Sequence, residues 1–190
     1  MVGGVQGVQA VPEVPGVRVR PWELTDVDAA HAAAMESVTE IQPWMPWCHP
    51  AYSIDDARAW VTSQIATFEQ RTAFEFAIVS ADGVFLGGCG LNQIDALNRR
   101  ANLGYWVRTS ASRRGVATAA VRAVRDWTFV DSGLLRLEIV IASGNVASHR
   151  VAEKAGAYRE GVLKQRLLLH GALHDATMFS FTRPVAPPTI

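Results

Sequence analysis

Runs of apolar residues along the chain follow two periods, and together they predict a sheet with helices on its faces. Short apolar segments, alternating or continuous, have the length of strands; they cover 16–22, 74–80, 84–94, 101–107, 134–142 and two strands around 170–171. Segments that favour helices lie between them; they cover 28–38, 53–68, the residues after 115, and 145–156. The order β-α-α-β-β-β-α-β-α-β-β predicts the α/β class with one mixed sheet.

Local signals mark several boundaries of these elements. Asp82 and Gly83 separate two strand-like segments and form a strong hairpin signal. Ser53, with Asp56 three residues later, is typical of a capping box that opens a helix. Gly156 ends the last short helix, since glycine suits a C-cap.

Composition limits the classes of function. The chain has 190 residues, 49% hydrophobic and 19% charged, which is typical of a soluble globular protein with one domain. Lys plus Arg and Asp plus Glu both total 18, so no global charge favours nucleic acid or an anionic membrane. No segment approaches the roughly 18 apolar residues of a membrane span.

The two ends of the chain differ from the middle. Residues 1–16 lack a basic region and a continuous apolar core, so we expect a flexible tail and not a signal peptide. A single domain is expected over 17–184, followed by a Pro-rich tail over 185–190. Cys48 and Cys89 are far apart and form no CxxC motif, which fits a reducing cytoplasm.

The stretch "SRRGVATAAVRAV", residues 112–124, places a cationic turn directly before a helix. The first amides of a helix have no carbonyl partner and carry a partial positive charge. Gly115 lets an anion approach the backbone, Arg113 and Arg114 add countercharge, and small residues leave room in the first turn. A phosphate site and an ordinary solvated loop before a core helix are both compatible with this stretch. No Walker or GxGxxG motif is present, which argues against a nucleoside triphosphate or NAD.

A second motif, "NVASHRVAEKAGAYREG", follows the strand at 134–142. Asn145 would be an N-cap and Ser148 the third helical residue, both common in structural helices. With the cationic turn upstream, however, the pattern N-x-x-S-x-R-V-x-E-K-x-G resembles the GNAT superfamily of acyl-CoA N-acyltransferases. It is most similar to the RimJ/RimL type, which acetylates the N-termini of ribosomal proteins.

The resemblance extends over about 17–183 and includes "RANLGYWV" and "LLLHGALHDATMFSFTR". It implies the GNAT fold, a mostly antiparallel mixed sheet of about seven strands with a central V-shaped splay and about four flanking helices. It also implies acetyl-CoA as co-substrate, with its pantetheine arm between the strands 103–107 and 136–142. Its pyrophosphate would lie on the amides of 114–118. The residues expected to bind acetyl-CoA are Trp106, Val107, Arg108, Arg113, Arg114, Gly115, Val116, Ala117, Thr118, Asn145, Ser148 and Arg150.

Family members transfer acetyl directly from the thioester to an amine, and the sequence contains no nucleophile motif such as GxSxG. The resemblance assigns hydrogen bonding of the leaving thiolate to Ser148. The sequence leaves several candidates for the general base. Glu138 is an isolated carboxylate in an apolar strand, and it is either catalytic or paired with Arg136 or Arg166. Asp175 has the same two interpretations, and water alone could serve an N-terminal amine with a pKa of about 7.7–8.0.

The sequence leaves several alternatives for the site that binds the acceptor amine. The aromatic loop "WMPWCHPAYS", residues 44–53, is stiffened by prolines and could wall an acceptor groove, cover the core or form a dimer surface. Candidate acceptor-binding residues are Trp44, Trp47 and Tyr105. The leading hypothesis is acetylation of a peptide or protein N-terminus. The alternatives are a small-molecule amine, namely a polyamine, amino acid or antibiotic, and a non-catalytic acyl-CoA sensor. The resemblance allows a homodimer, and the scattered histidines predict no metal site.

Overall fold

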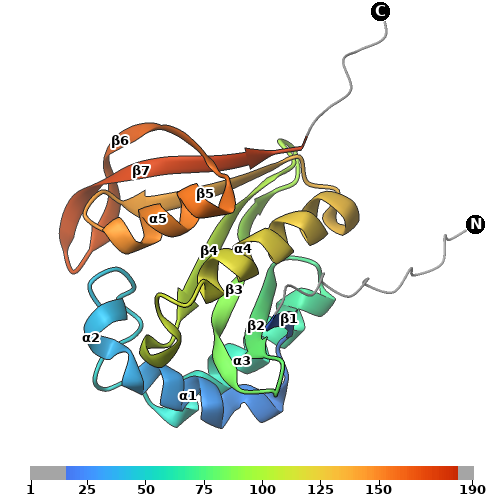
Figure 1. Ribbon diagram of the computed structural model, residues 1–190, viewed down its shortest axis with the longest axis vertical. Coiled ribbons are helices and arrows are strands. Elements are labelled where there is room, and N and C mark those ends of the chain that lie inside the picture. Colours follow the sequence, from blue (N-terminus) through green and yellow to red (C-terminus); the bar gives the residue numbers. More distant parts are fainter. Residues whose placement is uncertain (1–15, 184–190) are drawn as a thin grey trace, which may run out of the picture.

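The computed structural model describes residues 16–183, whose elements follow the predicted order (Figure 1). The strands are β1 (Val17–Pro21), β2 (Phe74–Ser80), β3 (Phe85–Asp95), β4 (Arg100–Val107), β5 (Arg136–Ala142), β6 (Tyr158–Leu169) and β7 (Ala172–Thr182). The helices are α1 (Val27–Glu36), α2 (Val38–Ile41), α3 (Ile54–Glu69), α4 (Val116–Trp127) and α5 (Val146–Ala155). The expected tails, apart from Gly16, lie outside the described residues.

The strands form a single sheet in the order β1-β2-β3-β4-β5-β7-β6. All neighbouring strands are antiparallel except β4 and β5, which run parallel. The predicted mixed, mostly antiparallel sheet is therefore confirmed. Within the described residues no helix is long and apolar enough to cross a membrane.

The sheet has an apolar core on each face. On one face α4 and α5 pack against the sheet, and Trp127 of α4 stacks edge-on against Phe74 and Phe76, with ring centroids 5.1 Å apart in both pairs. On the other face α1 and α3 pack around Trp22 and Phe85. Successive side chains of a strand point to opposite faces of the sheet. Because helices cover both faces, the residues on both faces are apolar.

The parallel pair β4–β5 opens soon after it begins. The strands pair only through Arg100–Asn102 and Arg136–Glu138. Beyond this point β4 stays bonded to β3 as far as Val107, and β5 stays bonded to β7 as far as Ala142. The two strands therefore diverge, and the backbone edges that face the gap pair with no other described strand (Figure 1). This is the central splay that the resemblance implies.

The predicted boundaries are confirmed at several turns. The hairpin at Asp82 and Gly83 joins β2 to β3, and Ser53 caps α3 by accepting a hydrogen bond from the Asp56 amide at 3.1 Å. The helix expected over 28–38 is interrupted, because α1 ends at Glu36 and α2 begins at Val38. Ser37 lies between them, fully buried, and its hydroxyl donates to the Ala33 carbonyl at 2.7 Å. It also accepts from the Thr109 amide at 2.9 Å, so it ties this break to the loop after β4.

Candidate active site

The turn before α4 presents an uncapped helix N-terminus. Gly115, with φ of +83°, is the residue before the helix, and no side chain of residues 16–183 caps the helix there. The first-turn amides of Val116 to Thr118 have no intrahelical carbonyl to bind. Apart from Gly115 and its chain neighbours, the described part of the chain has no heavy atom within 4 Å of the position that a Cβ on Gly115 would take, so the space above the turn is open to it. Arg113 and Arg114 are exposed beside it. This geometry fits a doubly anionic diphosphate.

Arg108, which we expected to contact the cofactor, is bound within the protein. Its guanidinium forms an ion pair with Glu36 at the end of α1 and donates to the Phe85 carbonyl at 3.2 Å. The Glu36 carboxylate also accepts from the Ser110 amide at 2.7 Å. These bonds, the one from Arg108 above all, lower the pKa of Glu36 to about 2. Arg108 therefore holds the loop between β4 and α4 against α1.

Two hydroxyl groups bridge the gap between β4 and the start of α5. The Tyr105 hydroxyl lies 2.8 Å from the Ser148 hydroxyl and donates to the Ser148 carbonyl at 3.0 Å. Burial raises the pKa of Tyr105 well above its usual value, so the phenol stays protonated and remains a donor. Asn145 is the N-cap of α5, and its side chain accepts from the Ser148 amide at 3.0 Å. Ser148 is thus held at the gap by bonds to its backbone and its hydroxyl.

Other predicted cofactor residues lie on either side of this gap. Val107 is the last residue of β4, and Arg150 is exposed on α5. The Trp106 side chain points to the face covered by α1, where its ring centroid lies 5.5 Å from that of Trp47. Any contact of Trp106 with the cofactor would therefore come from its backbone, while its ring belongs to the opposite face of the sheet.

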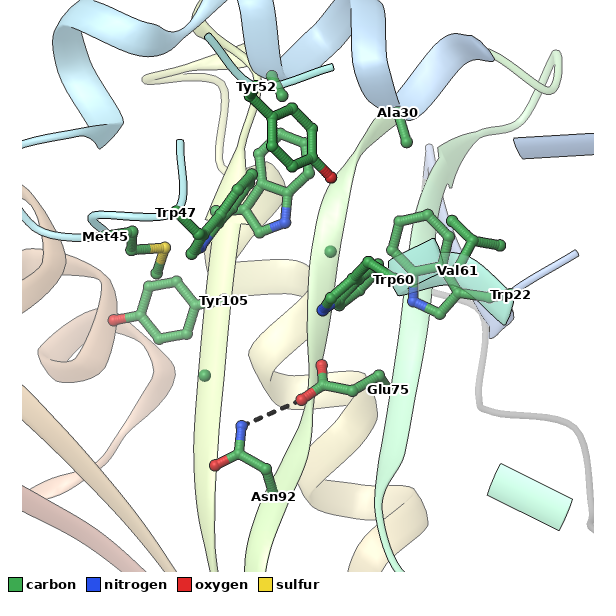
Figure 2. Close-up of a pocket in the computed structure, with 14 residues that line it drawn as sticks. Trp22, Ala30, Met45, Trp47, Tyr52, Trp60, Val61, Glu75, Asn92 and Tyr105 are labelled. Carbon is green, nitrogen blue, oxygen red and sulfur yellow. Dashed lines mark hydrogen bonds between the residues drawn. The ribbon is translucent and has the colours of Figure 1, made fainter. Parts of the chain in front are cut away.

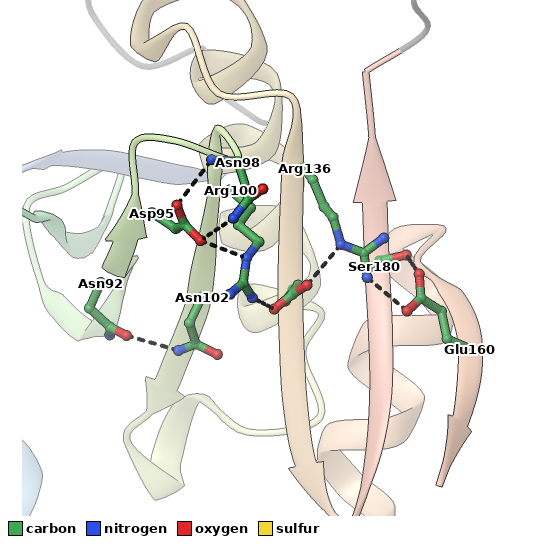
Figure 3. A network of polar contacts seen from close by, with 9 residues as sticks. Asn92, Asp95, Asn98, Arg100, Asn102, Arg136, Glu160 and Ser180 are labelled. Atoms are coloured by element: carbon green, nitrogen blue, oxygen red, sulfur yellow. Dashed lines mark hydrogen bonds and ion pairs between the residues drawn. The ribbon is translucent and has the colours of Figure 1, made fainter. Parts of the chain in front are cut away.

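Glu138 lies in a network of ion pairs. Its carboxylate binds Arg100 on β4 and Arg136 on β5, both at 2.8 Å. Arg136 also binds Glu160 at 2.7 Å, and Glu160 accepts from the Ser180 hydroxyl at 2.6 Å (Figure 3). Both carboxylate oxygens of Glu138 are therefore occupied. Of the two interpretations open from the sequence, this geometry favours the structural one, with Arg136 and Arg100 as partners in place of Arg166.

Asp175 on β7 is likewise paired. Its carboxylate binds the exposed Lys164 ammonium at 2.7 Å and accepts from the Gln165 amide at 3.0 Å. The bond from Lys164, followed by that from Gln165, lowers the pKa of Asp175. An acid held in its ionised form by a cation is a weak proton acceptor, so Asp175 also fits a structural role.

The face opposite α4 and α5 contains a pocket of about 230 Å³. Six aromatic side chains dominate its walls, and they are Trp22, Trp47, Tyr52, Trp60, Tyr105 and Trp106. The predicted acceptor residues Trp47 and Tyr105 are among them. Trp44 is not in this lining. Its ring would lie 3.4 Å from a Cβ on Gly144, directly before Asn145. The aromatic loop therefore does form a wall of a pocket, through Trp47 and its neighbours Met45 and Tyr52.

One carboxylate in this pocket was missed in the sequence. Glu75 on β2 points into the pocket and accepts a hydrogen bond from the Asn92 side chain at 3.1 Å (Figure 2). Burial raises its pKa. The available signal was the same as for Glu138, namely a single acid in the apolar segment 74–80. The part of the chain that the structure describes contains no cluster of metal-ligating side chains.

The fold and this geometry define the class of acetyltransferase that the sequence resembles, and comparisons with known proteins agree. Residues 17–158 match the Acetyltransferase (GNAT) domain family. The chain is 31% identical over 167 residues to Uncharacterized N-acetyltransferase p20 of Bacillus licheniformis, covering 87% of this chain and 92% of that protein. It is 28% identical over 142 residues to the ribosomal-protein-serine acetyltransferase of Escherichia coli, covering 75% of this chain and 79% of that protein.

A solved structure of RimL, a ribosomal-protein alpha-N acetyltransferase in complex with coenzyme A, has the same fold. Its TM-score is 0.84 at 23% identity, and the match covers 92% of this chain and 98% of RimL. The protein therefore belongs to the GNAT family of acetyltransferases. The family is the one predicted from the two sequence motifs.

Proposed function

We propose that the protein moves an acetyl group from acetyl-CoA directly to the α-amine at the N-terminus of a peptide or protein. The observation that carries this proposal is the hydroxyl pair of Tyr105 on β4 and Ser148 at the start of α5. It supplies a proton donor at the place where two strands separate beside an uncapped helix. The names of the relatives, among them the ribosomal-protein-serine acetyltransferase, support the type of acceptor.

Different residues would bind different parts of acetyl-CoA. The amides of Arg114 to Thr118 and the guanidinium groups of Arg113 and Arg114 would hold the diphosphate. The open backbone edges of β4 and β5 would bind the amides of the pantetheine arm, as an added strand does in a sheet. Acetyl-CoA supplies the activated acyl group, and the protein supplies its position.

Two of the described residues would serve the leaving group. The Ser148 hydroxyl, 2.8 Å from the Tyr105 hydroxyl, would donate a hydrogen bond to the thiolate as the C–S bond breaks. A hydrogen bond to a charged group contributes about 1.5–3 kcal/mol. The amine needs little activation, because an α-amine with a pKa of about 7.7–8.0 is roughly a tenth or more neutral at pH 7. A lysine amine, with a pKa of about 10.4, is neutral at less than one part in a thousand.

The test is release of free thiol from acetyl-CoA in the presence of a panel of acceptors. Peptides with a free N-terminus are compared with the same peptides blocked at the α-amine but containing lysine, and with spermidine and free amino acids. Turnover with free N-termini alone, with acetyl found on the α-amine by mass spectrometry, is the expected result. Turnover with small amines alone would establish the small-molecule alternative. Tight binding of acetyl-CoA without any turnover would establish a sensor.

Two further properties belong to the proposal. Cys48 and Cys89 are both free and buried, which supports a reducing cytoplasm as the location. A homodimer rests on the family resemblance, and light scattering of the purified protein tests it. A mass of one chain at micromolar concentration would contradict the dimer without affecting the proposed reaction.

A further inference from the structure

The sheet places Glu75 opposite two glycines. Glu75 on β2 pairs with Gly90 on β3, and Gly90 pairs with Gly104 on β4. A Cβ on Gly90 would lie 2.3 Å from Glu75 Oε2. The carboxylate therefore occupies space over β3 that a side chain at position 90 would fill. A Cβ on Gly104 would contact only the Asn92 amide at 3.9 Å. Neither glycine therefore places a side chain between Glu75 and β4.

A chain of side-chain amides orients the carboxylate. The Asn102 amide donates to Asn92 Oδ1 at 2.9 Å, which turns the Asn92 amide nitrogen toward Glu75 (Figures 2 and 3). Asn92 then donates to Glu75 Oε1 at 3.1 Å. Within the described residues no hydrogen bond satisfies Oε2. One oxygen of this carboxylate is therefore fixed, and the other lies over Gly90 and can bind a ligand.

The pocket reaches the gap between the strands. Gly104 forms part of its lining and lies two residues beyond Asn102, the last residue of β4 that pairs with β5. Tyr105 belongs to both sites, because its ring lines the pocket and its hydroxyl binds Ser148. An amine held in this pocket would thus approach the gap from the face opposite α4 and α5.

The charges in the pocket favour a cation. Among the described residues that line it, Glu75 is the one carboxylate, and none is Lys, Arg or His. The other titratable groups are Tyr105 on β4 and Tyr52 before α3, and burial raises the pKa of both phenols, that of Tyr52 to about 12. Cys89, on the opposite face of β3, also has a pKa raised by burial. All three stay neutral at pH 7, so among the described residues that line the pocket the Glu75 carboxyl group is the one able to face an acceptor with a charge.

The walls also favour an ammonium group. Trp22 and Trp60 meet edge-to-face with centroids 4.8 Å apart, and Trp47 meets Trp106 at 5.5 Å. Aromatic faces attract cations, most strongly where water is excluded. A carboxylate beside several indole rings is therefore a site for one organic cation.

We propose that Glu75 binds the ammonium group of the acceptor and accepts its proton, so that it is the general base of the transfer. This proposal rests on the proposed function and assigns the acceptor side of that site. Glu75 takes one proton from the ammonium group, and the nitrogen lone pair then attacks the thioester carbonyl carbon. The C–N bond forms and the C–S bond breaks. The nitrogen loses its second proton to the thiolate through the Tyr105 and Ser148 hydroxyls, and Glu75 releases its proton to water.

The pocket also limits the class of acceptor. A single carboxylate matches a single positive charge, so a monocation such as a peptide N-terminus fits better than a polyamine. Pockets that enclose a whole small ligand measure about 300–1,000 Å³. This pocket, at about 230 Å³, would enclose the amine and one small or apolar side chain, with the rest of the acceptor outside. We therefore assign it to an N-terminal residue without a charged side chain.

The experiment compares Glu75→Gln and Glu75→Asp with wild type and with the control Glu69→Gln, an exposed acid on α3. Glu75→Gln is expected to lower kcat/KM for a peptide acceptor by about tenfold at pH 7, because roughly a tenth of an α-amine is already neutral there without a base. Glu75→Asp keeps the carboxylate and is expected to recover part of this loss. The acetyl-CoA affinity of both Glu75 variants is expected to stay within about twofold of wild type. The kcat/KM of the control variant is expected to do the same.

Two readouts separate catalysis from structural support. Since burial raises the pKa of Glu75, its ionised form destabilises the fold, and Glu75→Gln is expected to keep or increase Tm at pH 7. The kcat/KM of wild type is expected to fall as the pH drops through the pKa of Glu75, and the Gln variant is expected to lack this fall. A decrease in kcat/KM below threefold, or a decrease accompanied by lower Tm and lost acetyl-CoA binding, would contradict the proposal.

The result also distinguishes the two proposals. If wild type acetylates no amine in the panel, the proposed function fails. If wild type acetylates peptides and Glu75→Gln does so equally well, the function stands and the role of Glu75 fails. Preference for spermidine over a monocationic peptide would contradict the assigned class of acceptor while leaving the base intact.

Discussion

Replacement of Ser148 by Ala tests the leaving-group role most sharply, because it removes the hydroxyl and keeps the backbone amide that bonds Asn145. The N-cap bond of α5 runs from the Ser148 backbone amide to Asn145, so the variant keeps it. Ala is also at least as favourable as Ser inside a helix. We therefore expect the fold and the binding of acetyl-CoA to be preserved, with Tm and Kd close to those of wild type.

The expected effect on kcat follows from the bond that is lost. A hydrogen bond to a developing thiolate contributes about 1.5–3 kcal/mol, and each 1.36 kcal/mol changes the rate tenfold. Ser148→Ala should therefore lower kcat by about 10- to 150-fold. The Tyr105 hydroxyl, at 2.8 Å from the Ser148 hydroxyl, acts through it. Tyr105→Phe should accordingly have a smaller effect, and it should add little in the Ser148→Ala background.

The assay is steady-state release of thiol at saturating acetyl-CoA, with calorimetry for its affinity. A double-mutant cycle over wild type, the two single variants and the double variant gives the coupling. An unchanged kcat in Ser148→Ala would remove this residue from the mechanism. Equal, additive losses in the two single variants would show that Tyr105 acts on the substrate independently of Ser148.

Two further predictions concern the turn before α4. Reversing both charges, Arg113→Glu with Arg114→Glu, should weaken acetyl-CoA binding at least about tenfold by calorimetry and abolish most of its salt dependence; unchanged affinity would show that the guanidinium groups take no part. Glu36→Gln should lower Tm at neutral pH by about 3 °C, from a partly exposed ion pair with Arg108 of about 1 kcal/mol. The pKa of Glu36 is lowered to about 2, so this contribution exists above the unfolded pKa of 4.5 and disappears as the pH falls toward 2. Equal Tm values for wild type and variant at pH 7 would refute it.

The sequence allowed the fold to be predicted where local chemistry decides the structure. The hairpin at Asp82 and Gly83, the cap at Ser53 and the helix ends at Gly115 and Gly156 are all confirmed, because each depends on one or two neighbouring residues. The break at Ser37 was not predictable in this way. Ser37 accepts a bond from the Thr109 amide there, and no local pattern shows a partner 72 residues away.

The candidate site was predictable only in part, for the same reason. Glu138 and Glu75 are both single acids in apolar strands, and the sequence does not distinguish them. In the structure Glu138 lies between Arg100 and Arg136, while Glu75 lies over Gly90 in an aromatic pocket. The difference depends on strand register, which joins residues that are distant in the chain. Register therefore decides which carboxylate can meet a substrate.

The proposed reaction requires the open turn around Gly115 and the gap between β4 and β5 to hold acetyl-CoA together. A crystal structure of the protein with coenzyme A tests it most directly. We expect the diphosphate on the backbone amides of 114–118, the pantetheine arm between the diverging strands, and the sulfur within hydrogen-bonding reach of Ser148. Electron density for the diphosphate at any other surface, or a sulfur remote from Ser148, would contradict this binding mode.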